Sequence, residues 1–190
     1  MTLANKITIA RILLIPLFVL CAVYYGRSVE QGPPQEWQRW AAVIVFLVAS
    51  VTDGLDGWVA RRFRQRSRLG AVLDPIADKG LLLAAIITLS LSKWTYAFPL
   101  WFPVLVIARD AVIVTGCILL KHLNGELEVR PSVWGKSATA LQMVAIAWVM
   151  LQLPFHLYSV YAAGLFTLVS GIGYFFEGIT QLRHHDNPNA

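Results

Sequence analysis

The sequence predicts an all-α integral membrane protein, a bundle of six transmembrane helices with both termini in the cytoplasm. Of its 190 residues, 57% are hydrophobic and only 14% are charged, whereas a soluble domain carries about 25% charged residues. The mean hydropathy is +0.60. Long apolar stretches recur along the chain, and the basic residues gather on one side of them. These observations exclude an ordinary soluble domain.

Six apolar stretches of about 20 residues, the length that crosses the hydrocarbon core of a bilayer, define the expected helices. They lie at residues 6–26, 39–60, 71–92, 97–121, 134–152 and 157–181. The first follows a short basic start, as in a signal peptide, but five further stretches favour a retained first helix. Nothing alternates as a barrel strand would. Because a bundle of this size contains no linker long enough to divide it, we expect one membrane domain over residues 1–190.

Short polar segments separate these helices. Residues 26–38 contain glycine and two prolines and are predicted to form a polar loop. Residues 122–133 are predicted to form a second loop, and shorter turns fall at Lys93–Trp94 and Leu153–Pro154. A short basic connection joins the second helix to the third, which makes these two helices antiparallel neighbours.

The distribution of lysine and arginine gives the orientation. With the N-terminus in the cytoplasm, the outer side receives only Arg27, Arg39 and Lys93. The inner side receives Lys6, Arg11, Arg61, Arg62, Arg64, Arg66, Arg68, Lys121, Arg130, Lys136 and Arg183. By the positive-inside rule both termini are cytoplasmic, which predicts a multi-pass protein of the cell inner membrane. The net charge of +5 therefore indicates orientation and an anionic substrate, and not nucleic acid.

Four aspartates lie at the predicted cytoplasmic ends of the second and third helices. Asp53 and Asp56 are followed by Gly57 and Ala60 at the spacing i, i+3, i+4, i+7, so they share one helical face. The third helix repeats the pattern with a spacing of four residues, at Gly70, Asp74 and Asp78. If the two helices are antiparallel neighbours, the two acidic faces can meet in a compact pocket.

Placing carboxylates beside hydrocarbon needs a compensating partner. Each costs roughly 2.5–3.5 kcal/mol at a helix centre, and divalent cations are the simplest compensation. Oxygen ligands without nearby His or Cys suit Mg²⁺ or Mn²⁺ and not zinc. Two such ions could clamp a diphosphate, a carboxylate could deprotonate an attacking hydroxyl, and Arg61 could bind a phosphate. Taken alone, Asp74 before Pro75 also fits a helix N-cap.

The complete string D-x-x-D-G-x-x-A-R, eight residues, G-x-x-x-D-x-x-x-D is filled at every fixed position between Asp53 and Asp78. It resembles the signature of the CDP-alcohol phosphatidyltransferase family. The resemblance implies transfer of a phosphatidyl group from CDP-diacylglycerol to an alcohol with release of CMP, and commonly a homodimer. It also implies two metal ions on Asp53, Asp56, Asp74 and Asp78, with Asp78 as the general base. The implied nucleotide and diphosphate site comprises Asp56, Gly57, Ala60, Arg61 and Gly70.

The flanking segments resemble the branch of the family that uses glycerol 3-phosphate as the acceptor, in phosphatidylglycerol and cardiolipin biosynthesis. The start contains N-x-x-T-x-x-R at Asn5, Thr8 and Arg11, and Pro131 to Trp148 is also similar. A phosphate-bearing acceptor needs cations, for which Arg109 and Lys136 are candidates. Arg109 could instead form a structural ion pair with Asp110, and Lys136 could be an inner-surface anchor.

Other functions remain open on the sequence. That branch usually has Arg-Glu where this chain has Arg109-Asp110. Arg-Asp resembles the cardiolipin synthase branch, whose acceptor is phosphatidylglycerol, and an inositol phosphate is a third possible acceptor. A cation transporter is a different class, but its acids are expected near the bilayer midplane within repeated halves. The sequence assigns no role to Lys79, Asp110 or Glu177.

Overall fold

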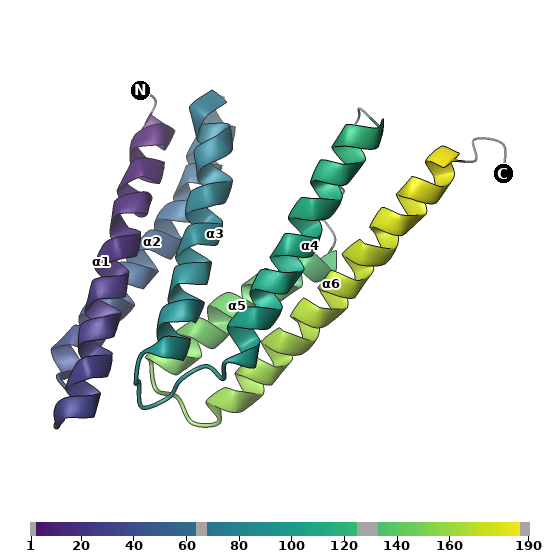
Figure 1. Cartoon of the computed structure of the whole chain (residues 1–190). Helices are drawn as coiled ribbons and strands as arrows, with labels where there is room; N and C mark the ends of the chain where they lie inside the picture. The colour runs from purple at the N-terminus through teal and green to yellow at the C-terminus, as the bar shows by residue number, and fades with distance from the viewer. Residues whose placement is uncertain (1–2, 64–67, 125–132, 187–190) are drawn as a thin grey trace. The chain divides into compact units, whose positions relative to one another are not determined.

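The computed structural model describes the backbone of residues 3–63, 68–124 and 133–186, and the side chains of 8–52, 77, 79–118, 133–178 and 180. All regular secondary structure in these residues is helical (Figure 1). The helices are α1 (Leu3–Gln31), α2 (Glu36–Phe63), α3 (Arg68–Leu91), α4 (Trp101–Asn124), α5 (Val133–Met150) and α6 (His156–Asp186). The predicted all-α class and the six predicted helices are therefore confirmed for the described part of the chain.

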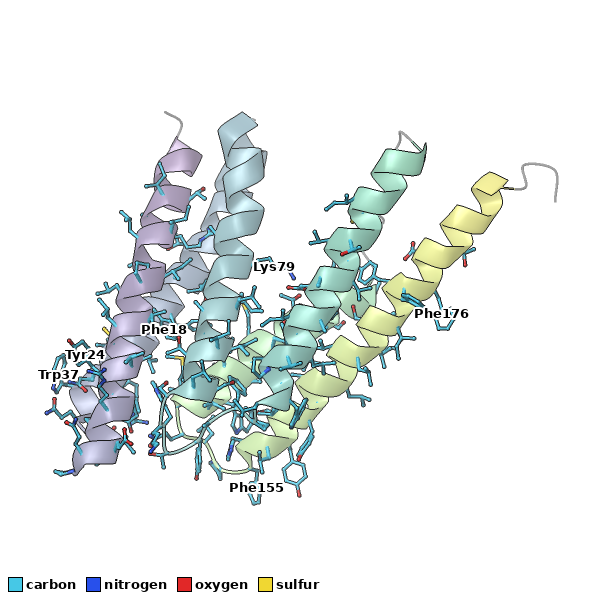
Figure 2. The ribbon with its side chains drawn as sticks, viewed as in Figure 1. Phe18, Tyr24, Trp37, Lys79, Phe155 and Phe176 are labelled. Carbon is cyan, nitrogen blue, oxygen red and sulfur yellow. The ribbon has the colours of Figure 1, made fainter. Side chains whose placement is uncertain are left out.

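Among the described residues, three helices are long and apolar enough to cross a membrane. They contain the segments Thr8–Gln31, Trp101–Ile118 and His156–Gly178. Large apolar side chains on these helices face outward, and aromatic ones such as Tyr24 and Phe176 project away from the helices (Figure 2). Apolar surface of this kind suits contact with lipid hydrocarbon, as expected of a membrane protein.

The connection between α1 and α2 is shorter than the predicted loop over residues 26–38. Helix α1 continues to Gln31 and α2 begins at Glu36, because polar side chains do not prevent a helix from extending beyond its apolar part. Helix α1 ends where Gly32 takes a φ of 156°, a conformation that glycine tolerates. The Oγ of Ser28 accepts a hydrogen bond from the backbone N–H of Gln35 at 3.1 Å, which closes the turn.

The chain forms two compact units. The first comprises Met1–Pro99 with Val149–Leu153, and the second comprises Leu100–Trp148 with Pro154–Ala190. In the first unit, α2 runs back along α1 and α3 returns in the direction of α1, so α2 and α3 are antiparallel, as predicted (Figure 1). Helix α1 packs against both α2 and α3, and α2 also contacts α3.

The end of α1 is joined to the residues that follow α3 by aromatic and polar contacts. Trp94 donates a hydrogen bond from its indole N–H to the carbonyl of Ala22 at 3.0 Å. Its ring meets that of Tyr25 edge-on, with centroids 4.6 Å apart. The Tyr25 hydroxyl accepts a hydrogen bond from the amide of Gln152 at 2.7 Å. These contacts fix the α1–α3 packing at the end opposite to Thr8 and Arg11.

A close helix approach in the first unit gives a testable prediction for stability. A Cβ atom at Gly26 would lie 2.9 Å from Cβ of Ser92 and 3.1 Å from the backbone nitrogen of Lys93. Neither atom can move without shifting backbone, so Gly26→Ala is expected to destabilise the protein by about 1–3 kcal/mol. Thermal unfolding in detergent should show a lowered Tm. Gly116→Ala, where a Cβ meets nothing within 4 Å, is the control, and equal Tm values for both variants would refute the prediction.

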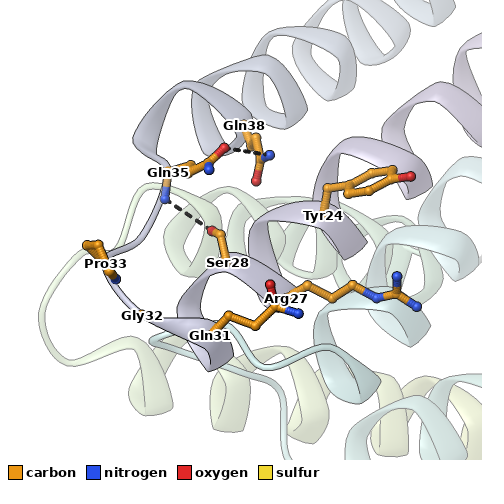
Figure 3. A pocket seen from close by; sticks show the side chains of 8 residues that line it. All are labelled: Tyr24, Arg27, Ser28, Gln31, Gly32, Pro33, Gln35 and Gln38. Carbon is orange, nitrogen blue, oxygen red and sulfur yellow. Dashed lines mark hydrogen bonds between the residues drawn. The ribbon is translucent and has the colours of Figure 1, made fainter.

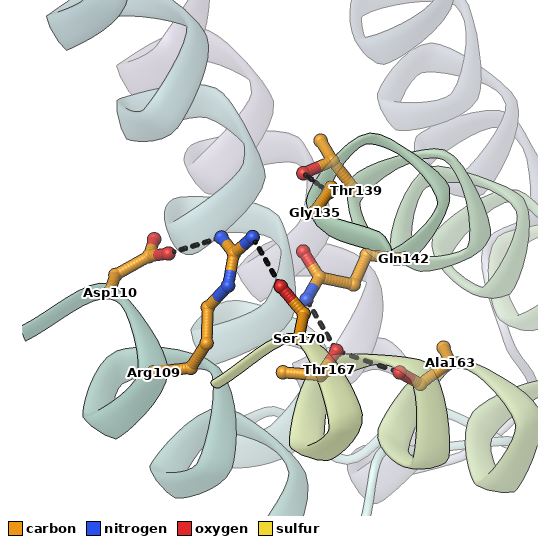
Figure 4. A network of polar contacts seen from close by, with 8 residues as sticks. All are labelled: Arg109, Asp110, Gly135, Thr139, Gln142, Ala163, Thr167 and Ser170. Carbon is orange, nitrogen blue, oxygen red and sulfur yellow. Dashed lines mark hydrogen bonds and ion pairs between the residues drawn. The ribbon is translucent and has the colours of Figure 1, made fainter. Parts of the chain in front are cut away.

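In the second unit, α4 packs along α6 and α5 is joined to α6 by buried polar groups. The amide of Gln142 donates to Oγ1 of Thr167 at 2.8 Å, and that hydroxyl donates to the carbonyl of Ala163 at 2.7 Å (Figure 4). Gln142 is 1% exposed and Thr167 is fully buried. Hydrogen bonds between helices replace water where a polar side chain is buried among apolar ones.

Candidate functional site

The four predicted metal ligands lie in continuous helices. Asp53 and Asp56 are in α2, and Asp74 and Asp78 are in α3. The helical backbone therefore meets the condition under which spacings of three and four residues place side chains on one face. The side chains of all four aspartates lie outside the described residues, as do those of Ala60 and Arg61 and the surroundings of Gly57 and Gly70. Their arrangement around a metal or a nucleotide stays a prediction.

The N-terminal part of α1 carries two buried polar residues. Thr8 and Arg11 are both 0% exposed, and each has an interaction within the protein. A fully buried guanidinium requires compensation by neighbouring groups, so Arg11 is part of the interior of the first unit and not an anchor at its surface. Asn5 lies in α1 as well, and its side chain is outside the described residues.

Arg109 in α4 is the most strongly held cation among the described side chains of the second unit. The residue is 7% exposed. Its Nη1 donates to Oδ1 of Asp110 at 2.7 Å, and its Nη2 donates to Oγ of Ser170 at 3.1 Å (Figure 4). Its Cζ lies 5.7 Å from the ring centroid of Tyr174, within the range of a cation–π contact.

The Nε–H of Arg109 is buried and has no hydrogen-bond partner among the described residues. The ion pair with Asp110, one of the two roles considered for Arg109, is present. It still leaves the Nε–H donor uncommitted. An unsatisfied buried donor costs about 1–3 kcal/mol, and a bound acceptor atom would recover this free energy.

Lys136, the second candidate for the acceptor, lies in α5. It is exposed, and its side chain makes no hydrogen bond or ion pair with the described residues. It follows Gly135, which lies close to Arg109 in the second unit. Lys136 is therefore an exposed charge at the helix surface, in contrast to the buried and hydrogen-bonded guanidinium of Arg109.

The partners of Arg109 were not predicted from the sequence. Ser170 and Tyr174 belong to α6, which reads as an apolar span. A signal was nevertheless present, since Thr167, Ser170, Gly171 and Tyr174 follow the spacing i, i+3, i+4, i+7. That spacing places polar and small residues on one face, which is typical of a face that packs against other membrane helices.

Two hollows lie on the described surface, and the second of them adjoins Arg109. One of about 410 Å³ lies at the α1–α2 turn (Figure 3) and is lined by Tyr24, Arg27, Ser28, Gln31, Gly32, Pro33, Gln35 and Gln38. It is at the opposite end of α1 from Thr8 and Arg11. The other, of about 450 Å³, lies between α4 and α6, and its wall is apolar apart from Arg109 and Thr167.

An all-helical membrane protein whose second and third helices carry this aspartate signature has the features of one family of lipid-synthesising transferases. The chain belongs to the CDP-alcohol phosphatidyltransferase family, whose model matches residues 1–172. It is therefore an enzyme, a phosphatidyltransferase, and the resemblance carried by the spacing of the aspartates is confirmed.

Curated relatives include proteins of Escherichia coli strain K12, Shigella flexneri serotype 5b and Shigella sonnei. Each is named CDP-diacylglycerol–glycerol-3-phosphate 3-phosphatidyltransferase. Each is 40% identical to this chain over 150 residues, which cover 76% of this chain and 74% of the relative.

Proposed function

We propose that this enzyme transfers the phosphatidyl group of CDP-diacylglycerol to glycerol 3-phosphate and releases CMP, in phosphatidylglycerol and cardiolipin synthesis. The observation that carries the choice of acceptor is the 40% identity, over 76% of the chain, to relatives named for this reaction. The buried guanidinium of Arg109 supports it, because an acceptor with its own phosphate needs a positive charge to bind.

The carboxylates of Asp53, Asp56, Asp74 and Asp78 would hold two Mg²⁺ or Mn²⁺ ions. Oxygen donors alone suit these hard cations, and the helical backbone of α2 and α3 keeps the donors of each helix on one face. Metal ions held there would offset the negative charge of the diphosphate and of the departing CMP. Asp56, Gly57, Ala60, Arg61 and Gly70 would line the nucleotide and diphosphate site.

Asp78 would act as the general base. It accepts the proton of the acceptor hydroxyl, whose oxygen then attacks the phosphorus of the phosphatidyl group. The bond from this phosphorus to the bridging oxygen of the diphosphate breaks, and CMP leaves with that oxygen. The products are CMP and the phosphatidylated acceptor, and the proton remains on Asp78 until it is released to water.

Arg109 and Lys136 would supply positive charge for the phosphate of the acceptor. The uncommitted Nε–H of Arg109 can donate a charge-assisted hydrogen bond, which is roughly twice as strong as a neutral one. Asn5, Thr8 and Arg11 are included by resemblance as further acceptor-binding residues. The burial of Thr8 and Arg11 supports a role inside the protein for these two.

The distribution of basic residues supports a location and an orientation. We place the protein in the cell inner membrane with six spans, cytoplasmic termini and the active site at the cytoplasmic face. A homodimer and a single domain over residues 1–190 complete the proposal. The distribution of lysine and arginine between the predicted inner and outer sides, and not any one contact, supports this orientation.

An acceptor panel tests the proposed function. Purified protein is given CDP-diacylglycerol and Mn²⁺ with glycerol 3-phosphate, phosphatidylglycerol, myo-inositol 3-phosphate or serine, and CMP release is measured. We expect release with glycerol 3-phosphate to exceed that with the others by at least about tenfold, because an acceptor of another shape or charge leaves hydrogen-bonding groups of the site unpaired. A chelator should abolish it, and Mg²⁺ or Mn²⁺ should restore it.

The other outcomes of the panel discriminate between the remaining functions. CMP release with phosphatidylglycerol and with no other acceptor would identify a cardiolipin synthase, the branch that Arg109-Asp110 resembles in sequence. Release with myo-inositol 3-phosphate alone would assign that acceptor. A preparation that is folded and loaded with metal yet releases no CMP with any acceptor would refute the proposed reaction.

A further inference from the structure

We propose that Gly135, Ser170 and Tyr174 are positioning residues that hold the guanidinium of Arg109 in one orientation for an acceptor phosphate. The inference rests on the proposed function, since it names what prepares Arg109 for that role. It adds three residues from α5 and α6 that neither the aspartate signature nor the N-terminal motif contains.

Three contacts hold the guanidinium. Asp110 accepts from Nη1, Ser170 accepts from Nη2, and Cζ lies over the ring of Tyr174, 5.7 Å from its centroid. A guanidinium is planar and presents its five N–H donors in a rigid fork. Once both terminal nitrogens are held, the directions of the remaining donors are restricted, including that of the buried Nε–H.

Gly135 permits this arrangement because it has no side chain. A Cβ atom at this position would lie 2.8 Å from the hydroxyl of Tyr174 and 3.1 Å from Nη2 of Arg109. It would also lie 3.2 Å from Cε2 of the Tyr174 ring. Helix α5 therefore approaches both partners of the cation–π contact so closely that even a methyl group would displace them.

Gly171 shows that this restriction is local. A Cβ there would lie 3.4 Å from Cγ and 3.6 Å from Cβ of Arg109, which is close to ordinary van der Waals contact. It would touch the aliphatic stem and not the guanidinium. The requirement for glycine at Gly135 is thus tied to the charged end of Arg109.

The uncommitted donor favours a positioning role over a purely structural one. A guanidinium buried only to join helices is expected to spend its donors on protein acceptors, because unsatisfied buried donors are destabilising. Here the side chain is held firmly while Nε–H stays available. Fixing a donor before its ligand arrives lowers the entropic cost of binding, so losing the fixation should weaken acceptor binding.

The test compares glycine-to-alanine variants in the full-length enzyme. Gly135→Ala should raise KM for glycerol 3-phosphate by about tenfold, as expected when a hydrogen bond to a charged group is lost, and leave KM for CDP-diacylglycerol unchanged. Gly173→Ala is the matched control, because a Cβ there meets nothing within 4 Å, and its KM values should equal those of the parent enzyme.

A second control separates positioning from loss of stability. A Cβ at Gly164 would lie 2.8 Å from two ring carbons of Trp101, so Gly164→Ala introduces a clash in the same unit that does not involve Arg109. It should lower the Tm and leave KM for glycerol 3-phosphate unchanged. If Gly135→Ala behaves like Gly164→Ala, with a lowered Tm and unchanged KM, the inference is overturned.

Ser170 provides a test that does not depend on the folding of Gly135→Ala. Ser170→Ala removes the acceptor for Nη2 and should raise KM for glycerol 3-phosphate severalfold, whereas Ser170→Thr keeps the hydroxyl and should restore it. Unchanged KM in Ser170→Ala contradicts the positioning role. Arg109→Gln distinguishes the two levels of the proposal. If neither Arg109→Gln nor Ser170→Ala changes KM for glycerol 3-phosphate, the acceptor role of Arg109 fails. If Arg109→Gln raises this KM and Ser170→Ala does not, only the positioning inference fails.

Discussion

Replacing Asp78 by asparagine is expected to lower the rate of CMP release by about 10²–10⁴-fold, the range that a positioned general base contributes. Asparagine has nearly the same shape as aspartate and cannot accept the proton of the acceptor hydroxyl. It also removes one negative charge from the predicted ligand set, so weaker metal binding would add to the loss. The measurement is CMP release from CDP-diacylglycerol at saturating glycerol 3-phosphate and metal.

The control for Asp78→Asn is Glu177→Gln, which neutralises an exposed carboxylate near the end of α6 and should keep the parental rate. Raising the Mn²⁺ concentration separates the two contributions, because weakened metal binding is overcome by mass action and a missing base is not. Full activity of Asp78→Asn at any metal concentration would show that another group takes the proton.

Replacing Arg109 by glutamine is expected to raise KM for glycerol 3-phosphate by about 10–100-fold, which corresponds to losing a hydrogen bond to a charged group. Arg109→Lys keeps the positive charge but loses the planar fork, so its KM should lie between those of Arg109→Gln and the parent. Initial rates of CMP release at varied glycerol 3-phosphate give these values, and KM for CDP-diacylglycerol should not change.

Arg109→Gln also removes one of the partners of Asp110, whose side chain is only 15% exposed. Loss of an ion pair from a largely buried carboxylate is destabilising, so part of any loss could come from misfolding. The double variant Arg109→Gln/Asp110→Asn keeps a neutral pair of similar shape and serves as the control. A raised KM in both variants supports acceptor binding, whereas recovery of the parental KM in the double variant would assign Arg109 a structural role.

The helices were largely predictable because their apolar stretches match the thickness of a bilayer. Their ends were not, and α1 illustrates the reason. Its apolar part ends near Gly26, but the helix continues through Arg27 and Ser28 to Gln31. Hydropathy marks where hydrocarbon contact ends. The helix ends later, because Gly32 still donates to the carbonyl of Ser28 at 3.2 Å but leaves the helical conformation, and Pro33 has no N–H to continue the pattern.

Some candidate site residues could be predicted from the sequence, and others could not. The aspartates of α2 and α3 were found from spacing, because periodicity along one helix determines which side chains share a face. Arg109 was found because a cation within an apolar span is costly and therefore noticeable. Gly135 and Ser170 were not found, since a glycine and a serine in membrane helices have many ordinary roles.

The sequence by itself determined that this is a helical membrane protein of the CDP-alcohol phosphatidyltransferase family, with carboxylates suited to divalent metal ions. Those conclusions depend on composition and on order within single helices, which the chain carries directly. Only the tertiary structure decided that Arg109 is held by Ser170 and Tyr174 and that α5 passes close enough to require Gly135. Such contacts join α4, α5 and α6, and they follow from how whole helices pack and not from the spacing within any one of them.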